Sequence, residues 1–322
     1  MSTAAVQAVV DAGGTGITAV MNRVEARMAA LVADHGPLLA RYAGETIAAG
    51  GKRLRPLLVC LAAGVPPPQS DALIRAAVAV ELVHAATLVH DDVLDGSPLR
   101  RGRPTVFAAD GRRTATSTGD FLFSRAFAEL AGGGSTAAIS TLSRATSELA
   151  SGELMQRADA WNPDVPVARY LERCRLKTAV LFRAACELGA QAGGLDPDAL
   201  GAFGEQIGVA FQILDDVLDV TGPPERTGKP RGADLLDGTV TLPMLLAREL
   251  DPELRAVDLR AVRTPEQAAV ICDQIAATGA LNTARARALE MVADARAPLA
   301  GLRDGQRRAL ELVAAGVVDR YS

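Results

Sequence analysis

Two copies of one acidic pentad, DDVLD, restrict the fold of this chain more than any other feature. They occupy residues 91–95 and 215–219, and each follows a long apolar run and precedes a Gly/Pro-containing stop. Each set of three aspartates is therefore predicted in the last turn of a helix, where the macrodipole is negative and an acidic side chain costs a few tenths to about 1 kcal/mol. Because acidic residues occur at this unfavourable position in two helices, we expect a bound cation at both helix ends.

The remaining sequence has the same helical character. The 322 residues include 61 alanines, the best helix formers, while aromatic residues make up only 3%. We find no strand alternation and no low-complexity linker, so we predict one all-α domain over residues 1–322, with 1–15 as a candidate flexible end. Predicted helices lie at 16–33, after the break at 50–56 with Pro56 in the first turn, from 70 or 71 to 95 and from about 201 to 219, with loops at 131–135, 161–164 and 222–238.

Composition excludes several classes of function. The chain has 34 basic and 38 acidic residues, and this net charge of −4 argues against a nucleic-acid or anionic-membrane binder. The four cysteines lack the spacing of a metal site or disulfide framework, so we expect free thiols in a reducing cytoplasm. The first residues lack a basic start, and no apolar run reaches about 18 residues, so neither a signal peptide nor a stable membrane insertion is predicted.

The paired pentads suggest a metal. Carboxylates without nearby His or Cys ligands suit hard divalent ions, and Mg²⁺ held by one or two carboxylates, waters and phosphate oxygens fits best. A solvated helix end is the alternative for a single copy. The repetition after two apolar helices argues against that alternative.

Basic residues lie near both pentads without forming obvious pairs with them. Arg100 and Arg101 follow the first pentad, and His84 lies two helical turns before Asp91 on the same face. Acidic and basic clusters that occur together indicate a ligand with metal-bound phosphate groups. The alternative for His84 is an ordinary position in the core. The alternative for the lysines is that they remain in the sequence by chance and have no special role. The only lysines among the 34 basic residues are Lys52, Lys177 and Lys229.

Five stretches, in order along the chain, resemble the trans-isoprenyl diphosphate synthases, or polyprenyl synthetases. They are GGKRLRP, LVHDDVLDGSPLRRGRPT, LKTA, FQILDDVLDVTG and GKPRGADLLDGTVTLP, and the likeness spans roughly residues 45 to 245. The resemblance implies a single helical bundle around a central apolar cavity, three Mg²⁺ ions per active site and a cytoplasmic homodimer. It also implies the reaction, in which an allylic diphosphate ionises and the allylic cation alkylates the double bond of isopentenyl diphosphate.

By position, the resemblance gives each candidate residue a role. The implied metal ligands are Asp91, Asp92, Asp95, Asp215, Asp216 and Asp219. The implied isopentenyl diphosphate site is Lys52, Arg55, His84 and Arg101. The implied allylic diphosphate site is Arg100, Lys177, Thr178, Gln212 and Lys229. One departure is Thr239, where the family often has Lys, and we expect it to weaken allylic binding without abolishing activity.

Product length is predicted from the residues before the first pentad. In the family, the positions of Thr87 and Ala86, with Val83 a turn further away, form the floor under the growing chain. None of the three is bulky, so we predict an all-trans product of about six to ten isoprene units, since overpacking an apolar cavity costs roughly 1–3 kcal/mol and would stop elongation. Replacing Ala86 by Phe is expected to shorten the product.

Three alternatives stay open. A short-chain farnesyl or geranylgeranyl diphosphate synthase would share every motif except the open floor. A terpene cyclase or squalene synthase would lack the isopentenyl diphosphate site that Lys52, Arg55 and Arg101 suggest. A non-catalytic helical subunit would be expected to have lost one pentad, yet both are intact.

Overall fold

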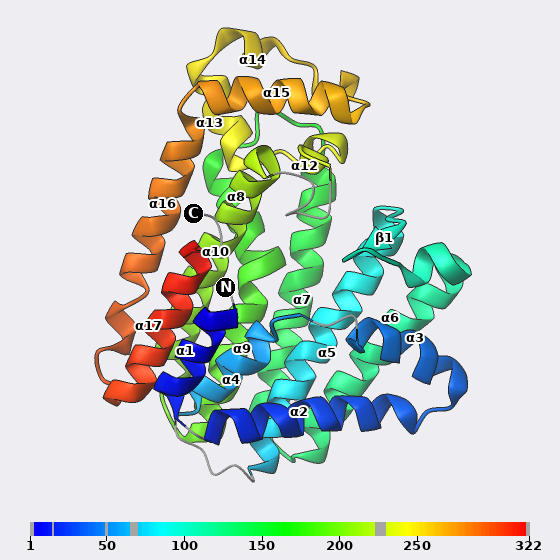
Figure 1. The fold of residues 1–322 in the computed structure, drawn as a ribbon, viewed down its shortest axis with the longest axis vertical. Helices are drawn as coiled ribbons and strands as arrows, with labels where there is room; N and C mark the ends of the chain where they lie inside the picture. Colours follow the sequence, from blue (N-terminus) through cyan, green and yellow to red (C-terminus); the bar gives the residue numbers. More distant parts are fainter. Residues whose placement is uncertain (1–2, 15, 49–50, 65–69, 223–229, 320–322) are drawn as a thin grey trace. The chain divides into compact units, whose positions relative to one another are not determined.

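The computed structural model describes residues 3–14, 16–48, 51–64, 70–222 and 230–319. Apart from one two-stranded ribbon, every regular element in these ranges is a helix, which confirms the all-α prediction (Figure 1). The chain divides into two compact units, so a single domain with a central cavity stays a prediction. Unit 1 is Met1–Thr146, Leu181–Gly204 and Ala297–Gly316, and unit 2 is Ser147–Val180, Glu205–Arg296 and Val317–Ser322.

Unit 1 is organised around its two longest helices, α5 and α6, which make the most extensive helix pair; α2 and α4 pack on α5, and α3 packs on α6. A short ribbon of β1 and β2 connects α5 to α6. The elements of unit 1 are α1 (Thr3–Gly13), α2 (Gly16–Ala33), α3 (Pro37–Ala48), α4 (Leu54–Ala62), α5 (Asp71–Leu94), β1 (Leu99–Arg100), β2 (Arg103–Pro104) and α6 (Val106–Gly132).

Helix α5 carries the first pentad. The Ser70 side chain caps its start by accepting a hydrogen bond from the Leu73 amide at 3.4 Å. Its apolar residues face all directions, as expected for a helix inside a core. By length and composition α5 is the one helix in the described ranges that could cross a membrane, and 72% of its apolar window is buried within the protein. The helix ends at Leu94, one residue before the predicted end at Asp95, which is its C-cap.

Unit 2 carries the second pentad and the LKTA stretch. Within it α13 packs against α8, α14, α15 and α16, and α12 packs against α15. Its elements are α8 (Val167–Cys174), a π-helical turn (Arg175–Ala179), α12 (Ala233–Leu236), α13 (Leu242–Leu250), α14 (Pro252–Ala256), a 3₁₀ turn (Leu259–Ala261), α15 (Pro265–Ala277) and α16 (Ala280–Asp294). Helices that contribute residues to both units are α7 (Thr136–Asp159), α9 (Val180–Gly193), α10 (Pro197–Thr221) and α17 (Asp304–Asp319).

Three local predictions need correction. Helix α10 begins at Pro197, because the Asp196 carboxylate accepts from the Asp198 amide at 2.9 Å and caps the start, and it continues to Thr221. The predicted loop at 222–238 contains α12, a single helical turn. The ribbon between α5 and α6 was not predicted, because its strands are only two residues long and show no alternation.

Candidate active site

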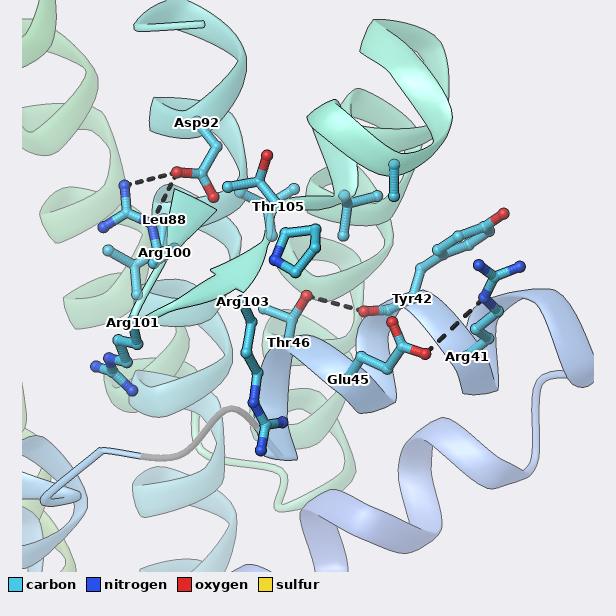
Figure 2. Close-up of a pocket in the computed structure, with 14 residues that line it drawn as sticks. Arg41, Tyr42, Glu45, Thr46, Leu88, Asp92, Arg100, Arg101, Arg103 and Thr105 are labelled. Carbon is cyan, nitrogen blue, oxygen red and sulfur yellow. Dashed lines mark hydrogen bonds and ion pairs between the residues drawn. The ribbon is translucent and has the colours of Figure 1, made fainter. Parts of the chain in front are cut away.

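The first pentad ends α5 with one buried and two accessible carboxylates. Asp92 is 5% exposed and accepts hydrogen bonds at Oδ1 from Arg100, whose Nε and Nη2 each lie 2.7 Å away (Figure 2). Asp91 is half-buried and Asp95 is exposed. The pentad therefore occupies the last turn of its helix, as predicted, and one of its three charges is neutralised by a cation from the adjacent ribbon.

The ribbon places its arginines through an unusual turn. Arg101 and Gly102 join β1 to β2 with φ angles of 53° and 75°, the positive values that a tight two-residue hairpin turn requires. Arginine rarely adopts this conformation, and such strain is concentrated at functional sites. The Arg101 guanidinium lies against Gly51, where a Cβ atom would come within 3.0 Å of Nη1. The turn thus brings Arg101 to the GGKRLRP segment, beside exposed Lys52.

Arg55 and His84 form a second part of this basic region. The Arg55 guanidinium stacks on the Phe182 ring at 4.7 Å, and its buried Nε has no hydrogen-bond partner within the described residues. Burial lowers the pKa of Arg55 to about 10, and the nearby Arg101 charge also lowers it. Burial, followed by the charges of Arg55 and Arg101, holds the pKa of His84 well below its usual value. A neutral imidazole beside the guanidinium groups of Arg55 and Arg101 is suited to binding an anion.

Arg53 has a different role from its neighbour Arg55. Its guanidinium donates to Glu25 at 2.6 Å, to Glu81 at 2.9 Å and to the Ile47 carbonyl at 2.8 Å. Its backbone is left-handed, with φ 47°, at the N-cap of α4. These contacts fix the backbone at Arg53, two residues before the half-buried Arg55 in the first turn of α4.

A pocket of about 430 Å³ lies beside the first pentad, between α3, the ribbon and the start of α6. Asp92 and its partner Arg100 line one side, and Arg101 and Arg103 extend from the ribbon (Figure 2). On the outer side, Arg41 lies 3.6 Å from Asp110. Other lining residues are Tyr42, Glu45, Thr46, Leu88, Val89, Pro104, Thr105, Val106 and Ala109.

The second pentad differs from the first at its buried carboxylate, which has no arginine partner among the described residues. Asp216 is 4% exposed, and it accepts from the Tyr170 hydroxyl at Oδ2 and from Gln212 Nε2 at Oδ1, both at 2.7 Å. Burial, followed by the charge of Asp234, raises the pKa of Asp216 to about 8. Asp215 and Asp219 are half-buried. Asp216, the second residue of its pentad as Asp92 is of the first, is thus held by neutral donors.

Lys177 and Thr178 lie in the π-helical turn between α8 and α9, a local irregularity that is frequent at functional sites. Lys177 Nζ lies 2.5 Å from Glu153 on α7, and Thr178 Oγ1 donates to Gln212 Oε1 at 2.7 Å. Helix α7 approaches the turn closely at Gly152, where a Cβ atom would lie 2.6 Å from the Lys177 amide nitrogen.

The structure therefore brings the predicted residues together in two groups. Lys177, Thr178 and Gln212 lie with the second pentad in unit 2, while Arg100 lies with the first pentad in unit 1. Lys229 lies outside the described residues. The predicted isopentenyl diphosphate residues Lys52, Arg55, His84 and Arg101 all belong to unit 1.

The three predicted floor residues differ in accessibility. Ala86 and Val83 are completely buried. Thr87 retains accessible surface, and its hydroxyl donates to the His84 carbonyl at 2.8 Å. Of the three, Thr87 is the residue whose side chain a ligand can reach without repacking the core.

Sequence reasoning missed two neighbours of the second pentad, Tyr170 and Asp234, and the partner of Lys177, Glu153. The amide of Asp234 donates to Asp219 Oδ2 at 3.3 Å, and its charge acts on Asp216. Asp234 falls within the GADLLD stretch that resembles the family, so the sequence could have indicated it as a candidate site residue. Tyr170 and Glu153 lie in helices without a distinctive local pattern and reach the site only through the tertiary fold.

The donor set fits Mg²⁺ shared with a substrate. Among the described residues, no three His, Cys, Asp or Glu side chains gather into an all-protein metal cage. That arrangement agrees with the habit of Mg²⁺ of taking one or two carboxylates and completing its octahedron with water and phosphate oxygens. The accessible or half-buried carboxylates at each helix end are the residues that could supply such ligands.

These features define an all-α protein with two acidic helix ends and a group of basic side chains around Arg55 and His84. The polyprenyl synthetase family model matches residues 37–277, and the chain belongs to this family. It is 45% identical to heptaprenyl diphosphate synthase component 2 of Geobacillus stearothermophilus over 68% of this chain and 69% of that protein.

Solved structures agree with this assignment. A polyprenyl synthase from Caulobacter crescentus CB15, complexed with calcium and isoprenyl diphosphate, superposes with a TM-score of 0.89 at 36% identity, over 98% of each chain. Heptaprenyl diphosphate synthase from Staphylococcus aureus superposes with a TM-score of 0.88 at 31% identity, over 95% of this chain and 99% of that one. The protein is therefore a prenyltransferase with the isoprenyl diphosphate synthase fold.

Proposed function

We propose that this protein condenses isopentenyl diphosphate with an allylic diphosphate and repeats the step to make a long all-trans polyprenyl diphosphate. The observation that carries the proposal is the group of Arg55, His84 and Arg101. A terpene cyclase ionises one diphosphate and needs only the acidic helix ends, whereas a synthase needs a second anion site. The buried, unpartnered Nε of Arg55 supports such a site.

The isopentenyl diphosphate residues act by binding and orientation. Arg55 and Arg101 carry fixed positive charge, and neutral His84 can donate one N–H to a phosphate oxygen. Exposed Lys52 adds a compact, mobile ammonium at the edge of the site. Holding the diphosphate in one place orients its double bond toward the allylic carbon, which converts a bimolecular step into an effectively unimolecular one.

The allylic diphosphate is assigned to Arg100, Lys177, Thr178, Gln212 and Lys229, with Mg²⁺ held by Asp91, Asp95, Asp215 and Asp219 and by their buried partners Asp92 and Asp216. We place three Mg²⁺ ions there. Bound Mg²⁺ would supply Lewis-acid neutralisation of the diphosphate leaving group. Since no described side chain is placed as an evident general base, we assign the final proton transfer to the released diphosphate.

Product length rests on Thr87, Ala86 and Val83. All three are small, and Thr87 offers accessible surface. A floor without a bulky side chain supports a product of about six to ten isoprene units, because a filled floor would resist each added unit by roughly 1–3 kcal/mol.

The direct test of the reaction class is diphosphate release by purified protein with Mg²⁺. We expect release that requires both isopentenyl diphosphate and an allylic diphosphate. Release from the allylic substrate alone would instead indicate a cyclase. Wild-type protein that bound an allylic diphosphate with Mg²⁺ yet released nothing with both substrates would indicate a non-catalytic subunit.

Assembly and location are part of the proposal. We propose a homodimer, while the name of the Geobacillus relative, component 2, raises a heteromeric assembly as the alternative. Light scattering of the purified chain together with its activity separates the two, since an active dimer needs no second component. All four cysteines are free and buried, which supports a reducing cytoplasm.

A further inference from the structure

The buried hydroxyl of Tyr170 has no place in the substrate or metal assignments above. Tyr170 is completely buried in α8, and its hydroxyl donates to Asp216 Oδ2 at 2.7 Å. Gln212 holds the other oxygen of the same carboxylate. Two neutral donors, one on each oxygen, leave the Asp216 carboxyl group a single orientation.

Tyr170 is itself held in place. The guanidinium of Arg173, which is 4% exposed, lies over the Tyr170 ring at 5.4 Å. The same guanidinium donates to the carbonyl of Val240, in the segment that joins α12 to α13. A continuous path of contacts therefore runs from Asp216 through Tyr170 and Arg173 to Val240.

Trp161 lies near the Val240 end of this path, and its fluorescence can report on it. Trp161 is the only tryptophan in the chain, and its amide donates to the Gly238 carbonyl at 2.8 Å. Its ring packs on Gly238 so closely that a Cβ atom there would lie 2.3 Å from ring carbon Cε2. A displacement of Gly238 therefore alters the surroundings of the Trp161 indole.

We propose that Tyr170 is a positioning residue for the second pentad, whose hydroxyl fixes the Asp216 carboxylate and, through Arg173, links it to the segment 237–240. The inference rests on the proposed function, since it takes Asp216 to be part of the metal site. Hydrogen-bonding partners of metal ligands typically change metal affinity about 10–100-fold when they are removed. The single hydroxyl of Tyr170 should lie at the lower end of that range.

The test is Tyr170→Phe, which deletes the hydroxyl and keeps the ring on Arg173. Thr141→Val is the matched control, because it removes a buried hydroxyl that accepts a hydrogen bond from Gln191 in unit 1 and belongs neither to a pentad nor to the pocket. Binding of Mn²⁺ with inorganic diphosphate is measured by electron paramagnetic resonance, without turnover. Tyr170→Phe should weaken Mn²⁺ binding about 10-fold, and Thr141→Val should not change it.

Two further readouts separate positioning from general damage. In an Asp216→Asn background, Tyr170→Phe should have almost no further effect, since both changes act on one carboxylate. The Trp161 fluorescence change on adding Mn²⁺ and diphosphate should shift to higher Mn²⁺ concentration in Tyr170→Phe. Wild-type Mn²⁺ affinity in a folded Tyr170→Phe protein, or full additivity with Asp216→Asn, would overturn the proposal. Neither result would bear on whether the wild-type enzyme releases diphosphate.

Discussion

The two pentads have the same sequence but different chemical surroundings. In the first, buried Asp92 is ion-paired with Arg100 from a strained ribbon. In the second, buried Asp216 is held by the uncharged donors Tyr170 and Gln212, and its pKa rises to about 8. The buried carboxylate of the first pentad is thus paired with a cation from the protein, whereas the buried carboxyl group of the second is held by neutral donors, and a bound cation would favour its ionisation. Identical motifs do not imply identical electrostatics.

The largest expected effect comes from making the same substitution in both motifs. Asp92→Asn and Asp216→Asn should each lower activity by at least about 100-fold, as loss of one group from a charge-stabilising site does. Their effects on stability should differ. Asp92→Asn leaves Arg100 without its partner and should cost about 1.5–3 kcal/mol, while Asp216→Asn replaces a protonated carboxyl by its isostere and should cost less than about 1 kcal/mol.

Chemical denaturation of the metal-free proteins measures this difference directly. Equal stability losses in the two variants would show that the contrast between a charged and an uncharged environment has no energetic consequence.

The helices follow from local sequence signals, whereas part of the contrast between the two pentads depends on the tertiary fold. Apolar runs, caps and Gly/Pro stops predicted the helices and the position of both pentads, because those signals are local. The partners of the buried aspartates were only half predictable. Arg100 and Gln212 lie within eight and four residues of their aspartates, whereas Tyr170 lies 46 residues before Asp216 and reaches it only through packing. Arg53 and Arg55 look equivalent in sequence, yet one clamps carboxylates and the other stacks on Phe182.

The next prediction concerns the floor in unit 1. Thr87→Phe should shorten the product to about three or four isoprene units with condensation retained, because the side chain has accessible space to fill. Ala86→Phe, as predicted from sequence, should also shorten it, but Ala86 is fully buried, so this variant should lose roughly 1–3 kcal/mol of stability as well. Product chromatography and thermal unfolding separate the two. An unchanged product length in both variants would place the floor elsewhere.

A third prediction tests the packing beneath Lys177 in unit 2. Gly152→Ala places a methyl group against the backbone of the π-helical turn and should cost about 1–3 kcal/mol while raising the KM for the allylic substrate. Gly44→Ala is the matched control, because Gly44 is also helical but its Cβ would meet only an ordinary 3.6 Å contact. The control should gain about 0.5–1 kcal/mol from helix propensity. Equal behaviour of the two alanines would remove the argument for a close approach at Gly152.

The smallest effect is a pH dependence in the basic region of unit 1. Because the pKa of His84 is lowered on folding, the unfolded chain binds its proton near pH 6.5 while the folded protein leaves His84 neutral. Stability from this group is therefore present above about pH 6.5 and falls as the pH decreases below it, by up to about 1 kcal/mol near pH 5.5. Denaturation of wild type and His84→Gln at both pH values should show a shallower pH slope in the variant. An identical slope would mean that His84 titrates normally.

Chromatography of the chains made from labelled isopentenyl diphosphate, with Mg²⁺ and farnesyl diphosphate as primer, tests the central claim most directly. A prenyltransferase with two acidic helix ends, a separate isopentenyl diphosphate site and an unfilled floor should give chains of about six to ten isoprene units, since no bulky side chain opposes elongation. A wild-type product that ends at four units or fewer, or label that never enters a longer chain, would contradict it.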